Sequence, residues 1–281
     1  MFFSNNAQSI FFLDPPIPTA VYPLNGQFGT ADLSFHENPP GVPYNVQLAP
    51  GPFGQPNGSY QLSGSSTSYI EFPNNGGLDT RYSMTLLAWV FLENTDGPIF
   101  NYGVNYFGVH FWVGGGYLFC RFITRSGIYL SPLHSGKLNQ GAWNFVGASY
   151  DYHSGVEKLW IEGKVCEEQK ISTVELHTSG AVRMGVRTGD DRFLKGRISC
   201  MQVYNKALTE REVHAVRGLC FHKGLFGSIY TSQFLLLIKI YGSFLAFNFP
   251  LPERGLKLEV NEYLHLPMSS SAVNPCSFKT R

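Results

Sequence analysis

The stretch FLKGRISCMQVYNKALTEREVHAV, residues 193–216, changes from a strand pattern to a helix pattern within a few residues. Thr209 and Glu212 have the spacing of a capping box, in which each side chain accepts a hydrogen bond from the backbone N–H of the other residue. Glu210 and Glu212 place negative charge at the positive end of the helix dipole, and Gly218 is a natural stop. These signals predict a helix of about two turns. Such a helix is too short to form without a larger body to pack on.

The composition indicates that this larger body is built from strands. The chain has 281 residues, of which 43% are hydrophobic, and this is enough for one large all-β domain or two smaller ones. Its 30 glycines and 17 prolines are typical of many strands joined by tight turns. The net charge of +1, with no run of like charges, argues against binding to nucleic acid and to anionic membrane surfaces.

Alternating apolar residues predict many short strands, and residues 83–92 read as a central strand that is covered on both faces. The other predicted strands are residues 19–24, 59–64, 68–73, 106–113, 117–123, 143–151, 156–163, 181–186 and 196–204. A turn at 162–164 leads into a further strand, and residues 25–58 are expected to form a long ordered loop. In 196–204 neither alternate set is wholly apolar, which predicts a bulge or cover on both faces. Together these features predict an all-β, two-sheet antiparallel jelly-roll sandwich with one short C-terminal capping helix.

Six segments in this order resemble the laminin-G-like family of jelly-roll domains, whose concanavalin-like fold is shared with pentraxins and legume lectins. The segments are GSYQLSGSSTSYIEFPNN (58–75), SMTLLAWV (83–90), TDGPIFNYG (95–103), LNQGAWNFVGASYD (138–151), LWIEGKVC (159–166) and FLKGRISCMQVYNKALTEREV (193–213). The sequence is similar to versions found in cnidarian extracellular and adhesion-type proteins. The resemblance implies a domain over 18–219, an irregular lead over 1–17 and an atypical segment over 220–281. It also implies a lectin-like recognition role outside the cell or at its surface.

The predicted strands carry an unusual outward face, in which aromatic and basic residues alternate with the apolar core set. Its members are Tyr106, His110, Trp112, Tyr117, Phe119, Arg121, Lys158 and Trp160. Aromatic planes stack on sugar rings, and basic groups pair with sulfate or carboxylate. We therefore expect this face, with Asn101 and Tyr102 in a loop at its rim, to bind a glycan or a partner protein. Alternatively, the 25–58 loop or the C-terminal segment covers these rings, because exposed aromatic patches are uncommon in monomers.

Two further sites are suggested by short motifs. Asp190 and Asp191 in TGDDRF are the acidic residues left for a calcium site, because Ser199 and Cys200 stand where many family members carry acidic residues. The alternative is that this segment is a solvated turn. Asn57 begins an Asn-Gly-Ser sequon in a loop, so it is a candidate for glycosylation if the protein is secreted.

The five cysteines, at 120, 166, 200, 220 and 276, show no zinc-binding spacing. Cys120 and Cys200 lie in apolar strands and are expected to be buried, inert thiols. A disulfide is the alternative if the protein is secreted. The N-terminus lacks the basic region of a signal peptide, which indicates either that the protein is not secreted by that route or that the chain is a fragment.

An enzyme of this fold would need a pair of carboxylates on one strand face, as glycoside hydrolases have. The only acidic residues two positions apart are Glu210 and Glu212, which are committed to the helix cap. No nucleophile elbow, P-loop or HExxH motif occurs. The sequence therefore predicts no catalytic activity, and a glycan-cleaving enzyme is the least favoured alternative.

The segment 220–281 has three open interpretations. Residues 229–249 are long enough to span a bilayer, but Lys239 at the centre would cost ~3 kcal/mol of insertion free energy. FPL (249–251) followed by EYLHLP (262–267) resembles YPL (22–24) followed by SYIEFP (68–73), which would make the segment the start of a second domain. It could equally be the misread end of a gene. The favoured function is a non-catalytic recognition module for glycan or protein, and the main alternative is a structural matrix or adhesion domain.

Overall fold

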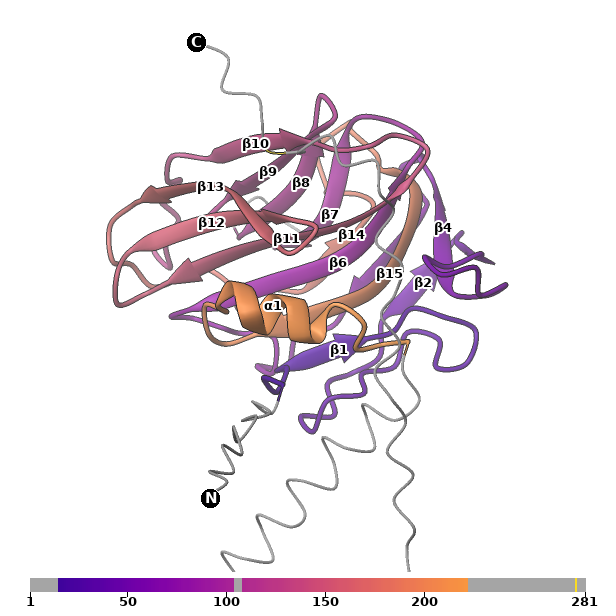
Figure 1. Ribbon diagram of the computed structural model, residues 1–281, viewed down its shortest axis with the longest axis horizontal. Coiled ribbons are helices and arrows are strands. Elements are labelled where there is room, and N and C mark those ends of the chain that lie inside the picture. The colour runs from indigo at the N-terminus through magenta and orange to yellow at the C-terminus, as the bar shows by residue number, and fades with distance from the viewer. Residues whose placement is uncertain (1–14, 104–107, 222–275, 277–281) are drawn as a thin grey trace, which may run out of the picture. The chain divides into compact units, whose positions relative to one another are not determined.

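The computed structural model describes residues 15–103, 108–221 and Cys276. The chain divides into two units, and the first comprises residues 1–222 with 275–281. All described residues belong to the first unit, which is a sandwich of two antiparallel sheets with one short helix (Figure 1). The predicted fold class is thus confirmed.

Within the described part of the chain, one sheet has eight strands and the other has seven. In sheet order the first comprises β13 (Lys164–Lys170), β12 (Val156–Ile161), β11 (Trp143–Asp151), β6 (Met84–Leu92), β15 (Lys195–Tyr204), β4 (Ser59–Ser63) and β3 (Gln47–Ala49), with β1 (Ala20–Tyr22) paired to β15. The second comprises β10 (Leu133–Lys137), β9 (Tyr117–Arg121), β8 (His110–Gly114), β7 (Gly97–Tyr102), β14 (Val182–Met184), β5 (Tyr69–Phe72) and β2 (Val42–Tyr44). Strands that are distant in sequence, such as β7 and β14, therefore lie side by side.

The core lies between the two sheets because each strand turns its apolar alternate set inward. Leu86, Ala88 and Val90 of β6 face Phe111 and Leu118 of the other sheet within one continuous buried cluster. Strand β6 is buried along nearly its whole length, as the sequence predicts for a central strand covered on both faces. Its outward set is covered by a second layer.

Helix α1 (Glu210–Val216) supplies this second layer over the eight-stranded sheet, where Figure 1 shows it beside β6 and β15. The predicted capping box is present, with reciprocal bonds between Thr209 and Glu212. The Trp89 indole N–H donates to the carbonyl of Arg217 over 3.1 Å, so the chain directly after the helix is fastened to the outward face of β6. This explains why the strand and the capped helix are adjacent in sequence: the helix turns back over the sheet that the strand has just joined.

The last strand contains the predicted bulge. The register of β15 against β6 shifts between Ser199 and Gln202, and Cys200 has a φ of 50°. Cys200 forms a disulfide with Cys220, so the prediction that Cys200 is a free thiol is wrong. The sequence showed an apolar strand but not the turn that brings Cys220 back to it.

The other three cysteines comprise one free thiol and one disulfide pair. Cys120 is a buried free thiol, as predicted, whereas Cys166 forms a disulfide with Cys276. Burial raises the pKa of the Cys120 thiol well above its usual value, which keeps it protonated and unreactive.

Four strands differ from the sequence-based expectations. Strands β2 and β3 lie within residues 25–58, which were expected to be loop, because both are short and exposed and therefore carry no alternating apolar signal. Strand β7 lies where a loop was expected, and β10, with the sequence LHSGK, was not predicted because it has only two residues buried. The turn before β13 is as predicted.

The predictions for residues 229–249, and for a second domain within 220–281, lie outside the described residues. Among the described helices, none is long and apolar enough to cross a membrane.

Candidate functional site

The predicted outward face exists on the seven-stranded sheet. His110 and Trp112 on β8, and Tyr117, Phe119 and Arg121 on β9, project from the side opposite the core. Their sequence neighbours belong to the buried cluster between the sheets, as strand alternation requires. The alternation prediction is therefore confirmed for these two strands.

Lys158 and Trp160 do not belong to this face, because β12 lies in the other sheet. Trp160 is only 2% exposed, and its indole N–H donates to the Ser149 hydroxyl over 2.9 Å. Lys158 pairs with Glu168 of the neighbouring strand over 3.2 Å. The prediction of one joint face was wrong because alternation identifies the side of a strand that faces outward, but not the sheet to which the strand belongs.

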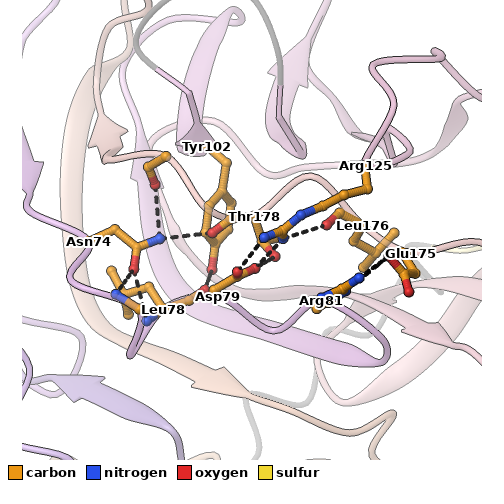
Figure 2. Close-up of polar contacts among 11 residues, drawn as sticks. Asn74, Leu78, Asp79, Arg81, Tyr102, Arg125, Glu175, Leu176 and Thr178 are labelled. Carbon is orange, nitrogen blue, oxygen red and sulfur yellow. Dashed lines mark hydrogen bonds and ion pairs between the residues drawn. The ribbon is translucent and has the colours of Figure 1, made fainter.

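Tyr102 is also absent from the outward face, and Figure 2 shows where it lies instead. Its ring is fully buried in the core, and its hydroxyl donates to the Leu78 carbonyl over 2.9 Å. Beside it, Asp79 accepts two hydrogen bonds from Arg125, at 2.7 and 2.8 Å, and one from Thr178 at 2.7 Å. Burial opposes the charged carboxylate, but these bonds outweigh it and lower the pKa of Asp79. The group fastens three loops at one end of the sandwich, so Tyr102 serves the fold there.

Asn101 and Trp112 hold each other in place on the outward face. The Trp112 indole N–H donates to the Asn101 side-chain oxygen over 2.8 Å, and both residues are almost fully buried. The guanidinium of Arg192 lies 4.7 Å from the centre of the Trp112 ring. Trp112 was predicted to contact ligand directly, but its ring is covered by this arginine. The cover comes from neither of the two segments expected to provide it, but from the loop between β14 and β15. Tyr106 lies outside the described residues.

A cavity of about 270 Å³ opens over this part of the sheet. Its lining residues come from β8, β9, the loop after β9 and the loop after β14: His110, Trp112, Val113, Gly114, Phe119, Arg121, Tyr129, Arg187 and Arg192. Four of the predicted residues are thus brought together in one cavity, whereas Tyr117 lies outside its lining, with its ring against that of His134.

Sequence reasoning missed five lining residues, of which three have aromatic or charged side chains, namely Tyr129, Arg187 and Arg192. The two arginines flank the TGDD turn, and they reach β8 because β14 pairs with β7, which places the loop after β14 beside the β7–β8 pair. The hydrogen bond from the Gly185 N–H to the Pro98 carbonyl, at 3.0 Å, fixes the start of this loop. Only the order of strands in the sheet reveals this proximity, and no local signal in the sequence does.

The cavity is rich in positive charge and contains a neutral histidine. Three guanidinium groups and no carboxylate are among the lining residues. Burial, with the nearby charges of Arg187 and Arg121, lowers the pKa of His110 to about 3, so its imidazole is uncharged near neutral pH. Its Nε2 atom is buried without a hydrogen-bond partner.

The guanidinium of Arg121 lies near two aromatic rings. It is 5.7 Å from the centre of the Phe119 ring and 5.9 Å from that of the Tyr129 ring. Tyr129 itself is 42% exposed. None of the ion pairs among the described residues includes Arg121. The rings thus orient a cation that keeps its polar edge for another partner.

The predicted calcium ligands are arranged differently from a metal site. Asp190 accepts two bonds from the Arg192 guanidinium, at 2.6 and 2.8 Å, and these lower the pKa of its carboxyl group. Asp191 is exposed. Within the described ranges, no three His, Cys, Asp or Glu side chains form a group that could hold a metal ion. The geometry gives the calcium prediction no support. Asn57 is exposed in a turn, which leaves glycosylation there a prediction.

Several solved binding domains share this architecture. The binding domain of Paraclostridial Mosquitocidal Protein 1 is 16% identical with a TM-score of 0.55, and the match covers 68% of this chain and 50% of that one. The binding domain of botulinum neurotoxin serotype G is 14% identical with a TM-score of 0.58, over 72% of this chain and 51% of that one. The serotype D ligand binding domain, solved in complex with N-acetylneuraminic acid, is 18% identical with a TM-score of 0.58, over 71% and 50%.

This chain spans about half the length of those structures, and at such identities the likeness shows the fold alone. No curated protein sequence matches the chain. The family model of the concanavalin A-like lectin/glucanases superfamily, however, matches residues 63–214, which is more than half of the chain and includes most of both sheets and the start of α1. The protein therefore belongs to the concanavalin A-like lectin/glucanase superfamily.

Proposed function

We propose that this protein is a non-catalytic carbohydrate-binding module whose ligand occupies the cavity over β8 and β9. The observation that carries the proposal is the composition of the cavity wall: the ring centres of Phe119 and Tyr129 lie 5.7 and 5.9 Å from the Arg121 guanidinium, and hydrogen-bonding groups are among the other lining residues. A sugar ring has an apolar face that packs on an aromatic plane and hydroxyl groups that need polar partners. The volume of about 270 Å³ is near the lower end of the range for ligand pockets, roughly 300–1,000 Å³, and suits one sugar unit.

The same wall supports binding without cleavage. Glycoside hydrolysis needs two carboxyl groups about the bond to be cut, and no Asp or Glu is among the lining residues. Asp190 lies near the cavity, but its carboxylate is held by Arg192. The three solved structures described above are named as binding domains, and one of them was solved with N-acetylneuraminic acid, which is consistent with this proposal.

We place the protein outside the cell or at its surface. Two disulfides, Cys166–Cys276 and Cys200–Cys220, support this location because such bonds persist in oxidising compartments. The solvent exposure of Asn57 is compatible with a glycan there. In this setting a sugar on a cell or matrix surface is the natural class of ligand.

The test is a glycan array probed with the full chain and with two variants, Phe119→Ala and Tyr129→Ala. Binding by the wild type, reduced at least tenfold by either variant, is the expected result. Lys158→Gln, on the other sheet, is the matched control and should bind as the wild type does. A folded wild type that binds no glycan on the array would overturn the proposal and favour a matrix or adhesion role with a protein partner. Binding unchanged in both aromatic variants would show that the glycan site lies elsewhere.

A further inference from the structure

We infer that the cavity selects an acidic sugar, one whose carboxylate or sulfate group is held by Arg121 together with Arg187 and Arg192. This inference rests on the proposed function and specifies its ligand. It starts from the charge of the lining, which contains three guanidinium groups and no carboxylate. A neutral sugar has no negative charge to pair with these cations.

The state of Arg121 supports an anionic partner. Within the described residues it has no ion pair, its Nε atom is buried without a hydrogen-bond partner, and its side chain is only partly exposed. The contacts with the two rings favour one orientation of its guanidinium. A planar guanidinium that is oriented in advance can donate two parallel hydrogen bonds to an anionic oxygen pair at a small cost in side-chain entropy.

Arg192 differs from Arg121 because Asp190 already holds it. The carboxylate takes the Nε and one terminal nitrogen of the guanidinium, and the cation is fixed over Trp112 with one terminal nitrogen left outside the pair. A fixed Arg192 shapes one wall of the cavity and keeps one terminal nitrogen as a donor without needing to move. Asp190 thus has a positioning role in place of the predicted role in calcium binding.

His110 supplies an uncharged polar group at the base of the cavity. It is 5% exposed and its Nε2 atom has no partner, and a neutral imidazole nitrogen can donate to or accept from a sugar hydroxyl. A protonated histidine would add charge but lose its acceptor. Burial, with the nearby arginines, lowers the pKa of His110 and keeps the imidazole in the form that can accept from a hydroxyl group.

The experiment measures the dissociation constants of the full chain for matched pairs of sugars by calorimetry. Methyl glucuronide and methyl glucoside differ only in the carboxylate, and N-acetylneuraminic acid is compared with its methyl ester. Galactose 6-sulfate against galactose distinguishes sulfate from carboxylate as the source of charge. We expect at least one acidic member to bind ten times or more tightly than its neutral partner, with the difference shrinking as salt is raised.

Three variants locate the effect. Arg121→Gln should reduce acidic-sugar binding at least tenfold, Arg121→Lys should retain part of it, and Lys158→Gln should leave it unchanged. Thermal unfolding of each variant confirms that it is folded, since Arg121 has no ion pair among the described residues to lose. Equal affinity for acidic and neutral sugars, with binding still lost in Phe119→Ala, would overturn the charge selectivity but leave carbohydrate binding standing. An absence of binding to every sugar in both experiments would overturn both proposals.

Discussion

The outer faces of the two sheets share one arrangement but differ in what lies over it. On the eight-stranded sheet the Arg217 guanidinium lies 4.9 Å from the Trp89 ring and pairs with Glu162. On the seven-stranded sheet the Arg192 guanidinium lies 4.7 Å from the Trp112 ring and pairs with Asp190. The first face lies under α1 and is closed, whereas the second keeps a cavity.

An aromatic outward face of such a sandwich can therefore be either a second buried layer or the wall of a cavity. Under α1, part of the outward set of the eight-stranded sheet forms a second buried layer that includes hydrogen-bonded polar side chains. Gln202, for example, donates to the Val216 carbonyl over 3.1 Å and accepts from the Tyr204 hydroxyl over 2.6 Å. The other face has a loop in place of a helix, so its polar groups face a space that a ligand can enter. The cover decides whether such a face stabilises the fold or serves as a site.

The two faces should differ most in how much a buried aromatic ring contributes to stability. Trp160→Ala on the closed face should lower the free energy of unfolding by ~3–5 kcal/mol, because it removes a fully buried ring. Phe119→Ala on the open face should cost about 1 kcal/mol or less. Denaturant unfolding of both variants provides the comparison. If Trp160→Ala is too unstable to purify, Trp160→Phe should show a smaller loss in the same direction. Equal losses at the two positions would contradict the distinction between the faces.

The second effect concerns the chain that follows α1. Replacing Cys200 and Cys220 together by alanine should cost ~3 kcal/mol, because the disulfide closes a loop of 20 residues. The backbone amides of α1 should then exchange with deuterium faster, because the segment after the helix is no longer linked covalently to β15. The matched control removes Cys166 and Cys276, which should leave α1 exchange unchanged. Unaltered α1 exchange in the first variant would show that packing alone holds the helix.

The third effect concerns Glu157, which turns into the core from the strand whose Trp160 turns outward. Its side chain is fully buried, one carboxylate oxygen accepts from Gln169, and the other has no partner. Burial raises the pKa of Glu157 to about 7, so the folded protein keeps a proton that the unfolded chain releases near pH 4.5. Stability from this group is therefore full below pH 4.5 and falls as pH rises to about 7.

Glu157→Gln should remove this dependence and leave the variant on the order of 2 kcal/mol more stable than the wild type at pH 8. The difference in unfolding free energy between the two proteins, measured from pH 4 to pH 8, isolates this group from all others. Parallel curves over that range would contradict the prediction.

The smallest expected loss of stability is at the N-terminus of α1, the helix that covers the eight-stranded sheet. Thr209→Ala removes the capping box of α1 and should cost about 1 kcal/mol. Thr173→Ala, at an exposed threonine, is the control and should cost almost nothing. Neither variant should change sugar binding, because α1 covers the other sheet. A loss of binding in Thr209→Ala would mean that the two faces are coupled through the core.

The features that could be predicted are those that depend on residues close together in the sequence. The capping box at Thr209 and Glu212, the bulge in β15 and the alternation of β8 and β9 all follow from spacings of two or three residues. Arrangements that depend on strand order were not predictable in the same way. Trp160 was assigned to the open face because nothing local distinguishes β12 from β9.

The candidate site was predictable only in part for the same reason. His110, Trp112, Phe119 and Arg121 were predicted because they alternate with apolar residues. Arg187 and Arg192 were not, because they reach the cavity through the pairing of β14 with β7, some 80 residues earlier in the chain. The covering of Trp112 by Arg192 depends on the same long-range pairing.

The disulfide between Cys166 and Cys276 also determines how the protein responds to a protease. The two residues are 110 positions apart, so the bond makes that part of the backbone a closed covalent ring. A single peptide bond cut anywhere inside the ring leaves one molecule of unchanged mass on a non-reducing gel. The fragments separate only after a reductant opens the ring, and fragments joined across Cys200 and Cys220 separate in the same step.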